Sequence, residues 1–200
     1  MDLGLLYSAG KDSTLAALLC DQFYDVTLVT VHFGVTDVHE HAREAAGDLE
    51  FPFRTLELDE ALARDAAERA VADGYPRHAI QDLHEHALEA VADLAFDTVG
   101  DGTRRDDRVP TVERSLARSV EDRHGVDYVA PLRGFGRSAV DALVDRAVGV
   151  ETGPSETVPA ADYESAVRAL VAAEHGRDAV DDVFPAHEQS RVHELDGEGS

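Results

Sequence analysis

The chain has 200 residues, of which 44% are hydrophobic and 30% are charged. This length and composition are typical of one globular domain with at most a small appendage, and they exclude a disordered chain. No apolar run is long enough for a transmembrane helix, and no basic segment of a signal peptide precedes the first apolar residues. Because there is a single cysteine, Cys20, a disulfide framework and a cysteine-based zinc or iron–sulfur site within one chain are excluded. We therefore expect a cytoplasmic protein without a membrane association.

The charge balance is unusual, because 41 acidic residues stand against 18 basic ones and the formal net charge is −23. All of the basic residues except Lys11 are arginine. At molar salt the Debye length is only about 3 Å, so the mutual repulsion of surface charges is screened. Strong acidity with almost no lysine therefore predicts a halophilic protein. It also makes the position of Lys11 informative, since lysine is normally a common residue.

Apolar patterning predicts strands that alternate with helices along most of the chain. In the first half we expect strands at Leu3–Tyr7, Val26–Phe33 and Phe53–Leu58, and helices at Ser13–Asp21, Val38–Leu49, Glu60–Ala72 and Arg77–Ala95. In the second half we expect strands at Asp97–Gly100 and Asp127–Leu132, a helix that begins at Pro110, and a helix at Ser138–Val148. Such alternation implies a parallel sheet with helices on both faces. The predicted fold is an α/β domain with an open, doubly wound, five-stranded, Rossmann-like parallel sheet.

This domain is expected to span residues 1–150, followed by a short helical extension over residues 151–195. Residues 152–155 (TGPS) have the composition of a linker, and helices are predicted at Ala160–Glu174 and Arg177–Val183. The polar stretch Pro185–Arg191 either folds back on the site or belongs to the tail. Residues 196–200 are expected to form a mobile tail.

The loop after the first strand has the features of a phosphate site. Small residues let the backbone approach an anion, and a helix that follows at once offers free N–H groups and the positive end of its dipole. Lys11 adds a positive charge, and Ser8 and Ser13 add hydroxyl donors. The single lysine of the chain therefore lies within a plausible phosphate cradle.

This loop resembles the PP-loop signature S-G-G-x-D-S of the N-type ATP pyrophosphatases, which have an adenine nucleotide alpha hydrolase-like fold. Ser8, Gly10, Asp12 and Ser13 match, and Ala9 stands in place of the middle glycine. Members of the family bind ATP on this loop and adenylate a substrate, with release of pyrophosphate. The resemblance implies that the segment from Ser8 to Ser13, with Ala9, Gly10, Lys11 and Asp12, binds ATP. It also implies that Phe33 and Gly34, at the end of the second strand, lie near the adenine.

A second segment, residues 102–111 (GTRRDDRVPT), follows the fourth strand. It resembles the G-H-x-x-D-D-x-x-E-T segment of the tRNA lysidine synthetase and tRNA 2-thiocytidine subset, which closes the ATP site and helps to place the substrate. The matching residues are Gly102, Asp106, Asp107 and Thr111, whereas Thr103 and Pro110 replace the histidine and the glutamate. The resemblance implies that Gly102 and Thr103 contact the nucleotide. Parallel-sheet topology should bring this segment beside the first loop.

The adenylation that this resemblance implies would place negative charge on the α-phosphate and on the leaving pyrophosphate, and Mg²⁺ and arginine neutralise such charge. The candidate catalytic residues are Lys11, Asp12, Arg104 and Arg105, and the candidate Mg²⁺ ligands are Asp12, Asp106 and Asp107. ATP and Mg²⁺ are the expected cofactors.

The acceptor substrate stays open. Residues 104–137 hold eight arginines and six acidic residues, which suits an anionic ligand, either ATP alone or also RNA such as tRNA. A sulfur or ammonia donor would be a partner protein, and a homodimer is compatible with the sequence. Two alternatives remain: a non-catalytic adenine-nucleotide sensor of the universal-stress type, and an RNA-binding factor that uses the arginine-rich region.

Overall fold

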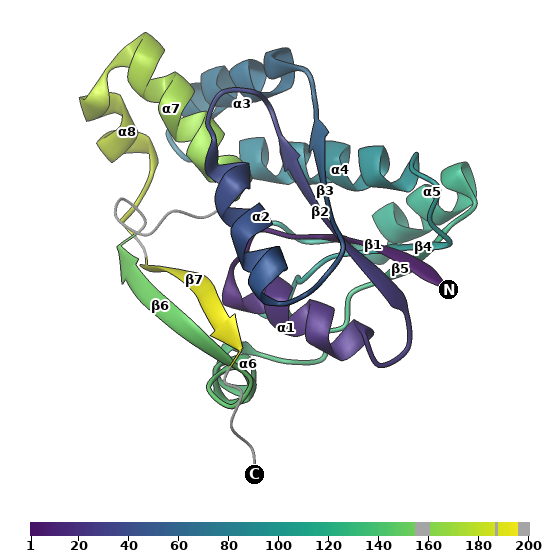
Figure 1. Cartoon of the computed structure of the whole chain (residues 1–200). Coiled ribbons are helices and arrows are strands. Elements are labelled where there is room, and N and C mark those ends of the chain that lie inside the picture. The colour runs from purple at the N-terminus through teal and green to yellow at the C-terminus, as the bar shows by residue number, and fades with distance from the viewer. Residues whose placement is uncertain (155–160, 187, 196–200) are drawn as a thin grey trace.

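The computed structural model of the chain describes residues 1–154, 161–186 and 188–195. Its strands β1 (Asp2–Leu6), β2 (Asp25–His32), β3 (Phe53–Glu57), β4 (Thr98–Gly100) and β5 (Asp127–Val129) form one sheet in the order β3-β2-β1-β4-β5 (Figure 1). Every neighbouring pair in this sheet is parallel. The predicted open α/β sheet is therefore confirmed.

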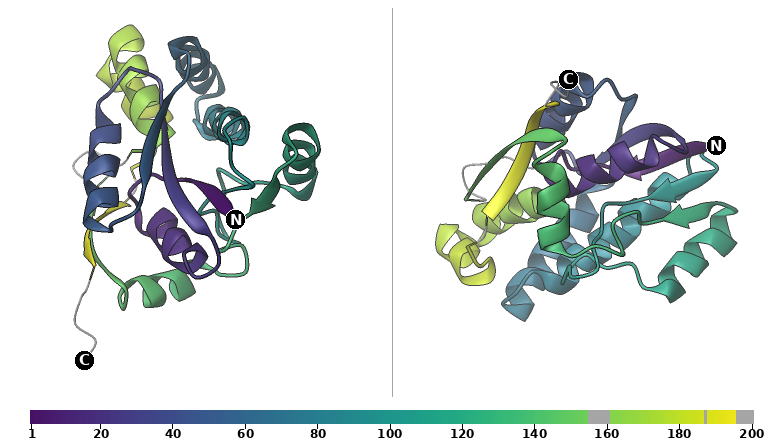
Figure 2. Two further views of the ribbon diagram at one scale, coloured as in Figure 1. Left: turned by 45° about the vertical axis from the view of Figure 1, so that its right-hand side comes forward. Right: turned by 90° about the horizontal axis from the view of Figure 1, so that it is seen from below.

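Helices cover both faces of the sheet, because the strands are apolar on both sides. Leu3 and Leu5 of β1 pack with α1 (Lys11–Cys20), α2 (Val38–Asp48) and α6 (Arg137–Val144), in one buried cluster. The other cluster contains Leu6, and its helices are α3 (Glu60–Asp73), α4 (Arg77–Ala92), α5 (Arg114–His124), α7 (Tyr163–His175) and α8 (Arg177–Val183). Figure 2 shows the two layers from further directions. None of the helices in the described ranges is both long and apolar enough to cross a membrane.

The strand order reverses between β1 and β4, which lie side by side at the centre of the sheet. The crossovers from β1 through β2 to β3 run to one side, and β4 and β5 extend to the other. In open α/β sheets a crevice forms at such a switch point, outside the carboxyl ends of the strands. The two segments that were singled out in the sequence follow these two central strands.

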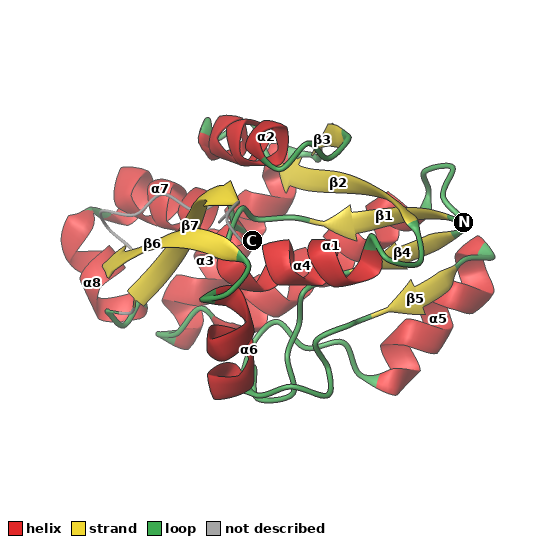
Figure 3. Cartoon of the chain, turned by 60° about the horizontal axis from the view of Figure 1, so that its bottom comes forward, coloured by secondary structure: helices red, strands yellow, loops and turns green. Residues whose placement is uncertain are grey.

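The part after residue 150 differs from the predicted helical extension. Residues 152–154 belong to strand β6 (Val148–Pro154), which pairs in antiparallel fashion with β7 (Glu188–Leu195). The predicted linker is therefore wrong for these residues. This two-stranded sheet lies apart from the main one, beside α1 and α2 (Figure 3). The predicted helices of the extension correspond to α7 and α8, whereas the proposed mobile tail, residues 196–200, lies outside the described residues.

The helix predicted from Pro110 begins at Arg114 instead. Both backbone groups of Thr111 are bound by one side chain: Thr111 N–H donates to Gln81 Oε1 at 2.9 Å, and Gln81 Nε2 donates to the Thr111 carbonyl at 2.8 Å. Both groups are hydrogen-bonded to Gln81 of α4, so they do not take part in the backbone hydrogen bonds of a helix. A proline is favourable at a helix start, but it does not override such tertiary bonds.

Candidate functional site

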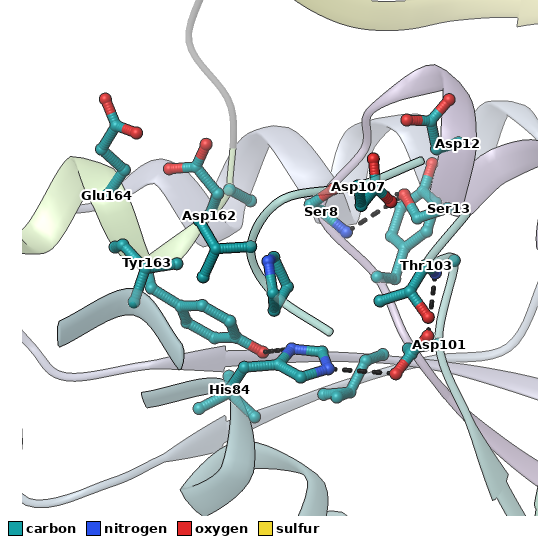
Figure 4. Close-up of a pocket in the computed structure, with 18 of the residues that line it drawn as sticks. Ser8, Asp12, Ser13, His84, Asp101, Thr103, Asp107, Asp162, Tyr163 and Glu164 are labelled. Carbon is teal, nitrogen blue, oxygen red and sulfur yellow. Dashed lines mark hydrogen bonds and ion pairs between the residues drawn. The ribbon is translucent and has the colours of Figure 1, made fainter. Parts of the chain in front are cut away.

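A cavity of about 360 Å³ opens at the carboxyl ends of β1, β2 and β4 (Figure 4). This size lies within the range of small-molecule sites. Its apolar wall consists of Leu6, Val29, Val31, Ile80 and Val109. Its polar lining includes Ser8, Asp12, Ser13, His84, Asp101, Thr103, Asp107, Asp162, Tyr163 and Gln189. An apolar wall opposite convergent polar groups is the usual character of a ligand site.

The loop between β1 and α1 is a tight turn that exposes the start of a helix. Ala9 has a φ of +59°, in the left-handed region that favours glycine, so alanine at this position is strained by about 1 kcal/mol. The Ser8 and Ser13 hydroxyls lie 3.2 Å apart, and Ser13 Oγ donates to the Gly10 carbonyl at 3.1 Å. The N-cap residue of α1, Gly10, has no side chain to cap the first turn, in which the Lys11 N–H donates to Ser190 Oγ. Two cavity-lining hydroxyls and the helix N-terminus therefore face the region where the sequence predicts phosphate.

Gly102 brings the second segment into direct contact with this loop. A Cβ atom at Gly102 would lie 2.9 Å from both the N and the Cα of Ser13, closer than any real contact. Only glycine lets the chain after β4 touch the first turn of α1. The expected juxtaposition of the two segments is present in the structure.

Arg104 lies among the acidic residues of both segments. Its guanidinium donates to Asp107 Oδ1, from Nε at 3.0 Å and from Nη2 at 2.5 Å, and its Nε lies 3.5 Å from Asp12 Oδ2. Nη1 of Arg104 is buried and has no hydrogen-bond partner within the described structure. Asp106 contacts both loops, because its Oδ1 lies 3.9 Å from Arg104 Nε and its Oδ2 accepts a hydrogen bond from the backbone N–H of Arg137 at 2.9 Å. The predicted carboxylates thus form an arginine-centred cluster.

Asp12 carries the features expected of a ligand-binding carboxylate. Burial raises the pKa of Asp12 against the opposing effects of Arg104 and Lys11. Its Oδ1 is buried and accepts no hydrogen bond within the described structure. No group of three metal-ligating side chains occurs among the described residues. Mg²⁺ that arrives with a nucleotide needs only one or two protein carboxylates, and the orphaned oxygen of Asp12 beside Asp107 fits that requirement.

Eight of the predicted residues are absent from the cavity lining, and four of them make contacts elsewhere. Lys11 forms an ion pair with Asp141 of α6. Arg105 is exposed and points its backbone N–H at the Phe135 carbonyl. Phe33 is buried with its ring 6.5 Å from that of Tyr163, and Gly34 lies beside Glu57. The cavity lining therefore includes six of the predicted residues, Ser8, Asp12, Ser13, Gly102, Thr103 and Asp107. It does not include the other eight, which are Ala9, Gly10, Lys11, Phe33, Gly34, Arg104, Arg105 and Asp106.

Sequence reasoning missed a buried polar network on the cavity floor. His84 Nε2 lies 3.0 Å from Asp101 Oδ2, and the Tyr163 hydroxyl lies 3.3 Å from His84 Nδ1. Asp101 also accepts hydrogen bonds from the Tyr128 hydroxyl at 2.9 Å and from Thr103 N–H at 2.8 Å. Burial acts to raise the pKa of Asp101, but the hydrogen bonds and charge of His84, with Thr103, hold that pKa below its ordinary value. The sequence showed His84 only as a histidine next to an apolar helix stripe, with no sign of its partners.

The C-terminal part of the chain folds back on the loop. Val192 N–H donates to the Ala9 carbonyl at 3.0 Å, and Ala161 N–H donates to the Ser8 carbonyl at 3.1 Å. Ser190 Oγ accepts a hydrogen bond from Lys11 N–H at 3.3 Å. Of the two readings of residues 185–191, the folded-back one therefore holds for the described residues of β7.

The family of unknown function DUF7411 matches residues 1–194 of the chain. The uncharacterized protein MJ0690 of Methanocaldococcus jannaschii is 37% identical over 193 residues, which cover 96% of this chain and 95% of that protein. A crystal structure from Methanocaldococcus jannaschii, described as a predicted subunit of tRNA methyltransferase, superposes with a TM-score of 0.90 at 36% identity and covers all of both chains. The match along almost the whole length, together with the shared fold, shows that this chain belongs to the family of unknown function DUF7411.

Proposed function

We propose that the chain binds ATP in this cavity and adenylates a substrate in tRNA modification, with release of pyrophosphate. The single observation that carries the proposal is the contact of Gly102 with the first turn of α1. It joins the two segments that resemble the PP-loop enzymes and places Asp12 between them at the cavity.

The residues have separate roles in this proposal. The apolar wall takes the adenine ring, while the Ser8 and Ser13 hydroxyls and the α1 N-terminus bind phosphate oxygens. Asp12 and Asp107 hold Mg²⁺, which when bound neutralises charge on the phosphates. Arg104 offers its unpaired Nη1 to the departing pyrophosphate. Lys11 reaches a phosphate only after it leaves Asp141, which ATP binding would favour.

The proposed reaction is an in-line displacement. A substrate oxygen attacks the α-phosphorus, the bond from phosphorus to the bridging oxygen breaks, and pyrophosphate leaves with the electron pair. An ammonia, amine or sulfide nucleophile then displaces AMP from the adenylated substrate. The description of the similar crystal structure as a predicted tRNA methyltransferase subunit supports a tRNA as the substrate.

Pyrophosphate release from ATP and Mg²⁺ in molar KCl tests the proposal. Wild type is compared with Asp12→Ala, and with Asp122→Ala, an exposed aspartate on α5, as the matched control. We expect release that is stimulated by tRNA, lost in Asp12→Ala and retained in Asp122→Ala. Release without stimulation by tRNA would indicate a small-molecule acceptor. ATP binding without pyrophosphate under any condition would overturn the enzyme proposal.

The last outcome would favour a second candidate function, a nucleotide sensor. The observation behind it is that both the side chain and the backbone N–H of Lys11 are occupied, by Asp141 and by Ser190. A sensor predicts that ATP binding changes the protection of α6 and β7 in hydrogen exchange while ATP stays intact.

A further inference from the structure

The loops after β4 and β5 are joined next to the cavity. Arg105 N–H donates to the Phe135 carbonyl at 3.0 Å, and the backbone N–H of Arg137 donates to Asp106. A Cβ atom at Gly136 would lie 2.8 Å from Arg105 Nη2, so the guanidinium lies directly against the Gly136 backbone. Figure 3 shows both loops between α5 and α6. The two loops form one surface, although they are far apart in the sequence.

Three arginines and one aromatic residue are exposed on these two loops, beside the carboxylate of Asp106, which lies against Gly136. We call the set of Arg105, Arg133, Phe135 and Arg137 the Phe135 platform. Phe135 is 39% exposed, and the three arginines are exposed as well. None of these arginines forms an ion pair with a described residue. Seven other arginines do, namely Arg43, Arg64, Arg69, Arg104, Arg123, Arg168 and Arg191, and the remaining seven of the chain form none with a described residue. In a chain of net charge −23, three unpaired arginines on two adjoining loops next to an exposed aromatic residue suit an external anion.

We propose that the Phe135 platform binds an unpaired nucleotide of an RNA, with its base stacked on the Phe135 ring and its phosphates on the arginines. This inference rests on the proposed function, for which it names the RNA contact. Aromatic rings stack on splayed-out bases, and arginine pairs with phosphate in a forked geometry. Paired bases of a duplex cannot reach the ring in this way, so the platform selects single-stranded loops or ends.

The chemistry favours RNA over a protein partner. A protein interface has an apolar core of several residues. The exposed large hydrophobic side chains in the described structure are Met1, Phe23, Tyr75 and Phe135, and only the last belongs to the platform. One ring among three charges is too small for such a core but suits one base and its neighbouring phosphates.

The position of the platform agrees with a role in substrate placement. Thr103 and Asp107 line the cavity, and Arg105 and Asp106, between them in the chain, contact the platform loop. One short segment therefore has the nucleotide cavity on one side and the platform on the other. A base stacked on Phe135 would bring its neighbours next to the site where ATP is proposed to bind.

Fluorescence anisotropy with three labelled probes tests the proposal in the absence of ATP: a tRNA transcript, a short oligouridine and a blunt RNA duplex, each at a series of KCl concentrations. Phe135→Ala should weaken binding of tRNA and oligouridine by about tenfold, while Phe135→Trp retains it. The double variant Arg133→Ala/Arg137→Ala should make the slope of log K against log salt shallower by about 1.5, as expected for two lost phosphate contacts. The matched control is Tyr75→Ala/Arg77→Ala, which removes an exposed aromatic residue before α4 and the exposed arginine that begins α4, and it should change neither quantity.

Three results would overturn the proposal. The first is RNA binding that is unchanged in Phe135→Ala, or absent in wild type. The second is a loss of duplex binding alone, since stacking on unpaired bases would then play no part. The third is loss of a dimer in Phe135→Ala, seen in the sedimented mass, with RNA binding unchanged, which would assign the platform to a second copy of the chain. The proposed function fails separately, if wild type neither binds ATP nor releases pyrophosphate while its RNA binding still depends on Phe135.

Discussion

Asp12 is the side chain at which fold stability and the proposed chemistry oppose each other. Its pKa is raised by burial, so the folded state favours the protonated form more than the unfolded state does. The stability that this residue contributes is therefore fully present below its unfolded pKa and is lost as the pH rises through the higher folded pKa. Burial therefore destabilises the ionised carboxylate in the folded state, which is consistent with the Mg²⁺-binding role proposed above.

Asp12→Asn should therefore raise the thermal unfolding midpoint at neutral pH and lower pyrophosphate release by about two orders of magnitude. Scanning calorimetry at neutral pH and near pH 4 measures the first effect, which should shrink at the lower pH. Asp122→Asn on α5 is the control for removal of an exposed charge. A midpoint that falls in Asp12→Asn would mean that the ion pair with Arg104 outweighs the burial of the carboxylate.

Residue types with a local role could be predicted, whereas long-range partners could not. The position of Ser8, Asp12 and Ser13 between a strand and a helix could be predicted from local pattern, and their role in binding an anion stays a prediction. His84 differs, because its partners Asp101 and Tyr163 are 17 and 79 residues away. The pairing of Lys11 with Asp141, 130 residues away, was equally out of reach.

The contact between α1 and the chain after β4 is the element-level feature on which the site depends. Gly102→Ala places a methyl group into the backbone of Ser13, so the two segments must separate. We expect a loss of about 2 kcal/mol in unfolding free energy, typical of forced overpacking, and loss of ATP binding. Urea unfolding and an ATP titration measure the two effects.

Gly47→Ala is the matched control for this prediction. Gly47 lies in α2, and a Cβ atom there would meet nothing within 4 Å. Because alanine is the better helix former, this variant should be more stable by about 0.5–1 kcal/mol and should bind ATP as wild type does. A stable, ATP-binding Gly102→Ala protein would show that the site tolerates separation of the two segments.

Asp101 joins three elements, because it lies after β4 and binds His84 of α4, whose ring contacts Tyr163 of α7. Its pKa is lowered, so its contribution to stability is present above the ordinary aspartate pKa of about 4 and is lost as the pH falls through the folded value. Asp101→Asn should lower the unfolding free energy by about 2–4 kcal/mol at neutral pH. The amide nitrogen of asparagine, itself a donor, would face His84 Nε2 and the Tyr128 hydroxyl where Asp101 Oδ2 now lies. The difference from wild type should narrow below about pH 4.

Urea unfolding over this pH range measures that difference, with Asp97→Asn, an exposed aspartate just before β4, as control. A penalty that stays constant at low pH would show that Asp101 acts through packing and not through its charge. The pH dependence also distinguishes Asp101 from Asp12. Both line the same cavity, but the pKa of Asp101 is lowered and that of Asp12 is raised.

Elements that form through local interactions could be predicted from the sequence, whereas elements that depend on distant residues could not. The parallel strands are apolar runs between helices, so local pattern was sufficient. Strand β6 includes Thr152, Gly153 and Pro154, which have loop composition, and becomes a strand only by pairing with β7, more than 30 residues later in the chain. The start of α5 was likewise displaced by Gln81, 30 residues away from Thr111.

At the scale of the whole molecule, the arrangement joins one cavity to one cationic surface within an acidic protein. The cavity lies at the switch point of the sheet, where topology alone predicts a ligand site. The segment 102–107 separates it from the Phe135 platform.

The same charge distribution predicts that salt stabilises the fold. At about 0.1 M salt the Debye length is about 10 Å and like charges on neighbouring helices repel, whereas at about 1 M it falls to about 3 Å. We expect the unfolding midpoint to rise by roughly 10 °C between these concentrations of KCl, because a few kcal/mol move the midpoint of a chain this long by about that amount. Replacing exposed acids on α3 and α8 by amides (Asp65→Asn, Glu68→Gln, Asp181→Asn and Asp182→Asn) should raise the midpoint at low salt and flatten its rise. If the variant and wild type gain equally from KCl, general salting-out rather than screening stabilises the protein, and its acidity serves solubility instead.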